Sequence, residues 1–196
     1  MRRINVSPER RRIIDQTTAF FDARGTSAHA TGGFLRDALL GLQPRDLDVA
    51  VAGDSLAIGR TLADELTGHF VTLDEGRGHV RILLPDADVT IDLTPLSGSV
   101  EEDLRRRDYT IDALGAPLRE VAAGAVDVID PTGGLADLEA RLVRATSEEA
   151  LRDDSLRPLR GARIAAQLSF EIEASTREMI SRHAAQVAEA APERQR

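Results

Sequence analysis

The sequence predicts an α/β fold, with a mixed β-sheet flanked by helices, followed by the first helices of an all-α region. In residues 1–145, short segments of alternating apolar and polar residues indicate strands. Between them lie segments that begin at capping residues and end at glycines, which is typical of helices. From about Glu148 the strand patterns disappear, and leucines from Leu151 to Leu168 follow helical spacing. We therefore expect an α/β domain over residues 1–145 and the start of a helical domain over residues 146–196.

Each element has its own local signal. Helices are expected over residues 8–24, 34–40, 55–68 and 100–107; the first follows Ser7 as N-cap with Pro8 in its first turn, and the last has a capping box of Ser99 and Glu102. Strands are expected over residues 27–31, 46–51, 69–73, 79–84, 88–94 and 126–129. A turn is expected over residues 130–134, which include a proline and two glycines.

Composition limits the kind of protein. The 196 residues include no cysteine, which excludes disulfides, thiolate catalysis and cysteine-bound zinc. No segment has the apolar length of a membrane span and the N-terminus lacks a signal peptide, so we expect a soluble cytoplasmic protein without a membrane partner. The net charge of -8 argues against a broad nucleic-acid-binding surface and against DNA as a partner. Every basic side chain is arginine, a planar donor suited to phosphates and base edges.

Three aspartates are the candidate catalytic and metal-binding residues. Asp46 and Asp48 are two apart in an expected strand, so their carboxylates project from the same face and repel each other unless a cation is bound. Mg²⁺ is the natural cation, because it is hard and bridges carboxylates to phosphates. The Asp-x-Asp pattern alone is more typical of two exposed acids near a turn. If the strand that contains Asp92 pairs beside the first, three carboxylates meet, and three can hold two Mg²⁺ ions for phosphoryl transfer.

Gly32 and Gly33 lie between an expected strand and an expected helix. Glycines there allow close backbone approach, and a helix N-terminus offers N–H groups to a phosphate. Arg36 and Asp37 follow one helical turn later, so these four residues are candidates for nucleotide binding. Arg77 and Arg81 lie further along, around a glycine-containing link, and are compatible with a solvated hairpin.

Four motifs occur in an order that resembles class II tRNA nucleotidyltransferases (CCA-adding enzymes) and the related bacterial poly(A) polymerases. The first runs from Thr31-Gly32-Gly33 to Arg45-Asp46-Leu47-Asp48, and the second is Arg106-Arg107-Asp108-Tyr109-Thr110 with its flanking residues. The third is Asp130-Pro131-Thr132-Gly133-Gly134, and the fourth is Asp153-Asp154-Ser155-Leu156-Arg157 followed by Arg160 and Arg163. The resemblance implies a nucleotidyltransferase head over residues 1–145 and the start of a nucleotide-selecting neck over residues 146–196, without the body and tail domains.

The resemblance also implies roles for residues of the second and fourth motifs. Arg107 and Asp108 would contact the ribose, with an ordinary surface ion pair as the alternative. Asp154 and Arg157, three apart on an expected helix, would select C and A, with a helical salt bridge as the alternative. Arg160 would contribute to the same nucleotide site. Near Arg77 and Arg81, the family has a loop that could bring an arginine to the triphosphate.

Three positions depart from the family pattern. Asp112 replaces the usual Asn, Ser97 replaces an Arg that often follows the third carboxylate, and Asp153-Asp154-Ser155 replaces Glu-Asp-Pro. None of them removes a candidate metal ligand. Family members continue into helical domains that grip tRNA, and Pro192-Glu193-Arg194 resembles the middle of the neck, so we expect a separate helical region or partner chain to complete the protein.

The expected function is Mg²⁺-dependent addition of C, A or both from CTP and ATP to the 3′ end of tRNA, with release of pyrophosphate. The motifs equally allow a poly(A) polymerase or a partial CC- or A-adding enzyme acting on another RNA 3′ end. A different class of function stays open as well. Acidity and short length are compatible with a non-catalytic nucleotide- or RNA-binding subunit that needs a partner chain.

Overall fold

The computed structural model describes residues 1–85 and 87–189, with the backbone alone for residues 184–189. Contacts divide the chain into two compact units. The first unit comprises Met1–Asp103 and Leu114–Ile129, and the second comprises Leu104–Ala113 and the residues from Asp130 onward. The expected segment 192–194 lies outside the described residues. Within the described part of the chain, no helix has both the length and the apolar character that a membrane span requires.

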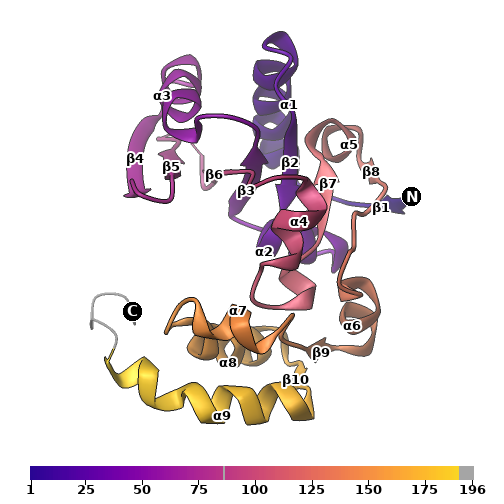
Figure 1. Ribbon diagram of the computed structural model, residues 1–196. Coiled ribbons are helices and arrows are strands. Elements are labelled where there is room, and N and C mark those ends of the chain that lie inside the picture. The colour runs from indigo at the N-terminus through magenta and orange to yellow at the C-terminus, as the bar shows by residue number, and fades with distance from the viewer. Residues whose placement is uncertain (86, 190–196) are drawn as a thin grey trace. The chain divides into compact units, whose positions relative to one another are not determined.

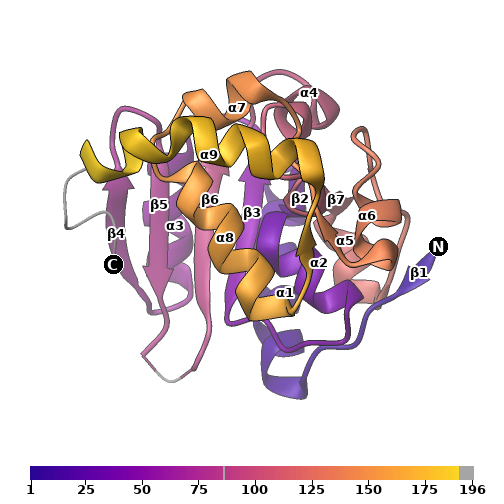
Figure 2. The same ribbon diagram turned by 90° about the horizontal axis from the view of Figure 1, so that it is seen from below.

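The first unit is built on a six-stranded mixed sheet with strand order β4-β5-β6-β3-β2-β7, seen face-on in Figure 2. The central pair, β3 and β6, is parallel, and the remaining pairs are antiparallel. The strands are β2 (Ala28–Thr31), β3 (Asp46–Val51), β4 (His69–Asp74), β5 (His79–Leu83), β6 (Thr90–Pro95) and β7 (Gly115–Pro117). The predicted α/β class with a mixed sheet is therefore confirmed.

Alternation along β3 and β6 fixes which face each side chain occupies. Leu47 pairs with Ile91 and Val49 with Leu93, and all four side chains are almost completely buried. Burying one such side chain contributes about 1.5–3 kcal/mol. A shift of one residue in register would move the whole apolar set to the opposite face, so these contacts strongly specify the register. As a result, the aspartates that alternate with these residues lie on the other face.

Helices flank this sheet, as Figure 1 shows. They are α1 (Pro8–Ala23), α2 (Gly32–Leu39), α3 (Ser55–Glu65) and α5 (Leu118–Ala123). The expected cap of α1 is present, because the Ser7 hydroxyl accepts from the Arg10 amide, and Asp54 caps α3 by accepting from the amides of Leu56 and Ala57. A two-stranded sheet of β1 (Arg2–Arg3) and β8 (Ala125–Val126) completes the unit. The predicted strand over residues 126–129 is thus shorter and begins earlier, and neither β7 nor α5 was predicted.

Helix α4 (Val100–Arg105) leads from the first unit into the second, and its predicted capping box is present, because Ser99 and Glu102 exchange two hydrogen bonds. The second unit contains a short 3-10 helix (Thr110–Asp112), α6 (Gly134–Ala140), α7 (Glu148–Arg152), α8 (Arg157–Leu168) and α9 (Ala174–Glu189). The expectation of no strand after about Glu148 was wrong. Strand β10 (Glu171–Ile172) pairs in parallel with β9 (Leu142–Val143). Each of these strands has only two residues, which is too short for an alternating pattern in the sequence.

Candidate active site

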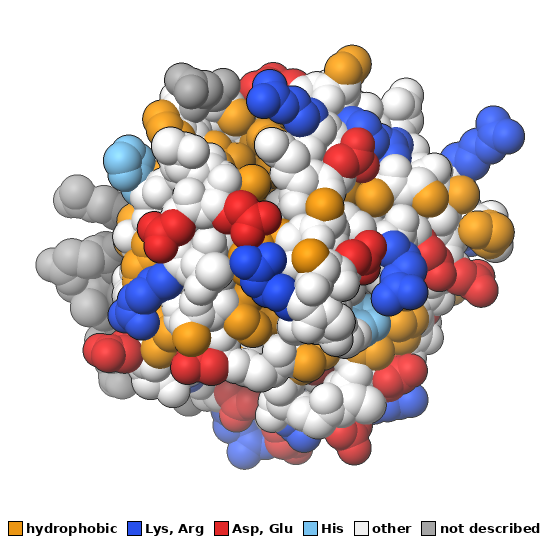
Figure 3. Space-filling model, turned by 90° about the horizontal axis from the view of Figure 1, so that it is seen from above, with side chains coloured by type: hydrophobic (Ala, Val, Ile, Leu, Met, Phe, Trp, Pro, Cys, Tyr) orange, Lys and Arg blue, Asp and Glu red, His pale blue; other side chains and the backbone are white. Residues whose placement is uncertain are grey.

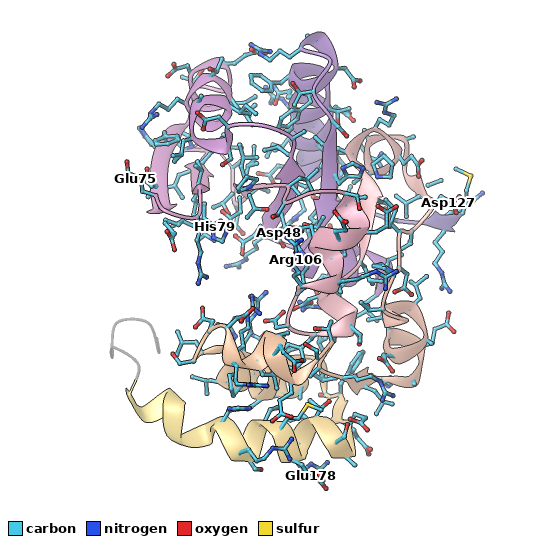
Figure 4. All side chains as sticks on the ribbon, viewed as in Figure 1. Asp48, Glu75, His79, Arg106, Asp127 and Glu178 are labelled. Carbon is cyan, nitrogen blue, oxygen red and sulfur yellow. The ribbon has the colours of Figure 1, made fainter. Side chains whose placement is uncertain are left out.

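The three candidate aspartates lie on one face of the central sheet in the first unit. Strands β3 and β6 are neighbours and parallel, and Asp48 is directly opposite Asp92. Asp46 lies two residues before Asp48, on the same face. The two strands therefore pair in the way that a meeting of three carboxylates requires. Figure 4 labels Asp48 on β3, whereas Asp127 lies far from it, beyond β8.

Each carboxylate is held by a different donor. Asp46 Oδ1 accepts a 2.5 Å hydrogen bond from the Thr90 hydroxyl, and Asp48 Oδ2 accepts one of 3.1 Å from the Phe34 amide. Asp92 is held most firmly, because Arg81 Nε donates to its Oδ1 at 2.8 Å and Arg81 Nη2 donates to its Oδ2 at 2.6 Å. The sequence did not predict these partners. They lie 11 to 44 residues away along the chain.

The Gly32–Gly33 turn brings the start of α2 against the aspartates. Gly32 has a φ of +65°, a conformation that side-chain-bearing residues rarely adopt. A Cβ atom on Gly33 would lie 3.5 Å from Arg36 Nη2 and 3.7 Å from Asp48 Oδ2. The structure thus brings the predicted Gly-Gly turn, Arg36 and Asp48 together. The Phe34 amide, in the first turn of α2, donates to a carboxylate, an arrangement that the helix dipole stabilises.

Arg36 is nearly buried, with 10% of its side chain exposed, and its Nε donates to Asp37 Oδ1 at 2.7 Å. A guanidinium fixed in this way offers a directed positive charge beside the start of α2. These contacts place Arg36 and Asp37 next to the aspartate face. Their expected part in nucleotide binding stays a prediction.

The donor chemistry of Asp46 and Asp48 suits a hard divalent cation, since both supply carboxylate oxygens from the same strand face. Asp92 does not fit in this arrangement, because Arg81 occupies both of its oxygens. Within residues 1–85 and 87–183, no group of three His, Cys, Asp or Glu side chains is placed to bind one metal ion. The site therefore offers two candidate ligands directly and a third only when the Arg81 pair opens.

In the second unit, Asp108 and Asp112 are buried carboxylates around one guanidinium. Arg160 Nε lies 3.4 Å from Asp108 Oδ2, and Arg160 Nη2 lies 3.6 Å from Asp112 Oδ2. The two aspartate side chains are 5% and 2% exposed, whereas Arg160 is 46% exposed. Asp108 is therefore not part of an ordinary surface ion pair, which was the alternative to its expected role. Arg107 neighbours it, and the contact of either residue with ribose stays a prediction.

Tyr109 fixes the start of α8 beside these carboxylates. Its hydroxyl donates to the Arg157 carbonyl at 2.8 Å. Its ring packs against Gly161 so closely that a Cβ there would collide with the phenol. Burial, reinforced by the charge of Asp108, raises the pKa of Tyr109, so the phenol stays protonated as a donor. Tyr109 thereby sets the position from which Arg157 and Arg160 project.

The expectation that Asp154 and Arg157 share one helical face was wrong. Asp154 lies in the turn before α8, where its Oδ1 accepts from the Leu156 amide, and Arg157 is the first residue of α8. Arg157 Nη1 donates to the Ala150 carbonyl at 2.6 Å. Pro158 indicated this helix start, because a proline is favoured in the first turn of a helix. The base-selecting role of the two residues stays a prediction.

The fold and site together define an α/β domain in which three aspartates occupy one face of a mixed sheet, beside a glycine turn at a helix N-terminus. Residues 28–97 and 86–144 match the family model of the poly A polymerase head domain. Because these matches span more than half of the chain, the chain belongs to that family. The predicted family resemblance is confirmed, and the fold of the first unit is that of a nucleotidyltransferase head.

Curated relatives include a CC-adding tRNA nucleotidyltransferase from Geobacter sulfurreducens, which is 42% identical over 87% of this chain and 39% of its own length. An A-adding tRNA nucleotidyltransferase from Deinococcus radiodurans is 40% identical over 81% of this chain and 34% of its own length. Among solved structures, a Thermotoga maritima CCA-adding enzyme complexed with tRNA aligns with a TM-score of 0.81 at 26% identity, covering 96% of this chain and 46% of that one. A CCA-adding enzyme with ATP aligns with a TM-score of 0.79, also at 26% identity, covering 96% and 45%.

The chain thus spans less than half the length of these relatives. Family membership implies a divalent metal ion in general. Its identity, and the activity, substrates and partners of the whole protein, are matters for proposal.

Proposed function

We propose that this chain is the catalytic head, residues 1–145, and the start of the neck, residues 146–196, of an RNA nucleotidyltransferase. It would add C, A or both from CTP or ATP to the 3′ end of tRNA, with Mg²⁺ as the metal ion. The observation that carries this proposal is the placement of Asp48 opposite Asp92, with Asp46 on the same sheet face. Relatives named for CC and A addition to tRNA support the choice of substrate.

In the proposed reaction, the RNA 3′-hydroxyl oxygen attacks the α-phosphorus of the nucleotide. The bond from this phosphorus to the bridging oxygen of the β-phosphate breaks, pyrophosphate leaves and the hydroxyl proton is released. Mg²⁺, when bound, lowers the pKa of the hydroxyl and neutralises charge on the triphosphate. Asp46 and Asp48 would hold it, with Thr90 and the Phe34 amide orienting their carboxylates.

The other residues of the first unit would bind the triphosphate. The Gly32–Gly33 turn permits close backbone approach, and Arg36 supplies a guanidinium held in place by Asp37. Such a fixed cation suits phosphate oxygens, because little conformational entropy is lost on binding.

The second unit would recognise the nucleoside. Arg107 and Asp108 would contact the ribose, and Asp154, Arg157 and Arg160 would contact the base. Support comes from the fixed positions of these groups: Asp108 is buried beside Arg160, and Arg157 is anchored to the Ala150 carbonyl.

A transfer assay tests this function. The 196-residue chain is incubated with Mg²⁺, labelled CTP or ATP and tRNA that lacks its terminal nucleotides. Asp46→Ala and Asp48→Ala should each reduce incorporation at least about a hundredfold, because metal-ion charge stabilisation is worth several kcal/mol. Asp127→Ala is the matched control and should retain activity, since this exposed residue pairs with the N-terminus away from the cluster. No incorporation by the wild-type chain, or equal incorporation by Asp46→Ala, would contradict the proposal.

Two alternatives have specific support. Relatives named for CC addition and for A addition both align with this chain. Nucleotide competition on defined tRNA ends would distinguish four activities: CC addition, A addition, CCA addition and poly(A) synthesis. The net charge of -8 favours a non-catalytic subunit that depends on another chain for RNA binding. Mg²⁺-dependent ATP binding without transfer, restored to transfer by a helical partner, would favour that second alternative.

A further inference from the structure

Arg81 is a charged residue on the aspartate face to which the proposed function gives no role. It lies on β5, directly opposite Asp92 on β6. Asp92 is in turn directly opposite Asp48 on β3. The three side chains therefore form a row across three adjacent strands, in the order Arg81, Asp92, Asp48, opposite to the face that carries Val80 and Leu93.

The pair between Arg81 and Asp92 is the best-formed ion pair of the row. Both carboxylate oxygens accept from the guanidinium, at 2.8 and 2.6 Å, which is the fork geometry of strong arginine–carboxylate pairs. The two side chains are 35% and 17% exposed, so water screens them less than a surface pair. The hydrogen bond to Asp92 and the charges of Asp92, Asp46 and Asp48 raise the pKa of Arg81 further. Arg81 is thus a permanent cation in the field of all three aspartates.

The pair with Arg81 limits how metal can bind on this face. Both oxygens of Asp92 already accept from the guanidinium, whereas Asp46 and Asp48 are held by a hydroxyl and a backbone amide. A second divalent ion would have to displace Arg81 from Asp92 and would lie beside an unpaired guanidinium.

We propose that Arg81 is a resident counter-cation that positions Asp92 and withholds it from metal. In the nucleotide-free chain, one divalent ion binds at Asp46 and Asp48, and Arg81 blocks the second. This inference rests on the proposed function, because it takes Asp46 and Asp48 as the metal ligands. The new element is that Arg81, on the neighbouring strand, decides whether Asp92 is available to bind a metal ion.

Metal binding without nucleotide tests the inference. Mn²⁺ is titrated into the full chain, and free Mn²⁺ is measured by electron paramagnetic resonance. The wild-type chain should bind one ion at this site. Arg81→Gln should bind a second ion, or bind the first at least about tenfold more tightly, because removing a unit positive charge a few ångströms away is worth more than 1.4 kcal/mol. Arg81→Lys should fall between the two, since an ammonium keeps the charge but not the fork.

Two controls make the result specific. Arg60→Gln removes the same charge from α3, where Arg60 lies over the Phe70 ring, and should leave Mn²⁺ binding unchanged. The double variant Arg81→Gln/Asp92→Asn should lose the gain of Arg81→Gln, because the released carboxylate is gone. Far-ultraviolet circular dichroism establishes whether each variant is folded. If Arg81→Gln does not fold, the comparison of wild type with Arg81→Lys decides the test.

The outcomes separate this inference from the proposed function. Suppose that Asp46→Asn abolishes Mn²⁺ binding, whereas wild type, Arg81→Gln and Arg81→Lys bind Mn²⁺ equally. This result would overturn the inference and leave the metal site intact. A gain that survives in Arg81→Gln/Asp92→Asn would also overturn it. If neither the wild type nor Arg81→Gln binds Mn²⁺, or if Asp46→Asn has no effect, both the metal site and the inference fail.

Discussion

In the second unit, the Arg160 side chain offsets the negative charge of two buried carboxylates. It faces Asp108 and Asp112, two carboxylates that are almost fully removed from water. Buried charges cost several kcal/mol unless they are paired, so we expect the Arg160 guanidinium to contribute to the stability of this region. Asp112 stands at the position where the resembling family has Asn, and it adds the second negative charge.

Arg160→Met should therefore destabilise the chain by about 2 kcal/mol, a value below that of a fully buried pair because Arg160 is half-exposed. Urea unfolding at pH 7 measures the change. Arg163→Met, an exposed arginine on the same helix, is the control and should change stability by less than about 0.5 kcal/mol. Adding Asp112→Asn to Arg160→Met should recover part of the loss. Equal losses for Arg160→Met and Arg163→Met would show that the two carboxylates do not depend on Arg160.

At the scale of elements, the start of α9 depends on a side-chain cap that the sequence analysis did not identify. Glu173 Oε2 accepts from the Ser175 hydroxyl at 2.7 Å, the Thr176 amide at 2.8 Å and the Thr176 hydroxyl at 3.0 Å. These hydrogen bonds, led by that of Ser175, lower the pKa of Glu173 to about 2. Thr176 also accepts from the Ala145 amide, so the cap ties α9 to the segment after β9.

The stabilisation by Glu173 should depend on pH in a defined direction. Its pKa in the folded chain, about 2, is below the ordinary value of 4.5, so the contribution is complete above pH 4.5 and is lost as the pH falls through about 2. Glu173→Gln should lower the melting temperature at pH 7, and the difference from wild type should shrink between pH 4.5 and 2. Glu178→Gln, which changes an exposed acid on α9 (Figure 4), should give no such profile. A pH-independent difference for Glu173→Gln would contradict this account of the cap.

For the whole molecule, charge distribution limits how RNA can bind. Acidic residues outnumber basic ones by 33 to 25. On the face drawn in Figure 3, acidic and arginine side chains are interspersed. Because each neutralised phosphate contributes to the salt dependence of binding, the excess of acidic residues favours few phosphate contacts.

The affinity of this chain for tRNA should consequently depend weakly on salt. We expect the slope of log K against log salt concentration to be shallower than about −4, which corresponds to only a few neutralised phosphates. Filter binding or fluorescence anisotropy between about 50 and 200 mM salt measures it. A markedly steeper slope would indicate a concentrated basic surface, which the interspersed charges do not suggest. Mg²⁺ is held constant in the series, so that metal binding does not contribute to the slope.

The sequence predicted the central strands and the polar face of the site because strand periodicity is a local property. In Asp46-Leu47-Asp48-Val49 and Ile91-Asp92-Leu93, residues two apart must share a face, and the apolar residues must be buried. The caps at Ser7 and Ser99 were equally local. Elements with two or three residues, such as β7 and β10, were not predictable, since they form only where a neighbouring strand supplies hydrogen bonds.

By itself, then, the sequence indicated the family and the fold class and singled out the three aspartates as candidates. The tertiary structure alone decided their partners. Arg81 reaches Asp92 only because β5 and β6 pair in one particular register, and the Phe34 amide reaches Asp48 only because α2 begins against β3. It also separated Asp154 from the helix of Arg157. Hydrogen bonds and ion pairs depend on distances of a few ångströms between distant segments, and a local pattern does not contain those distances.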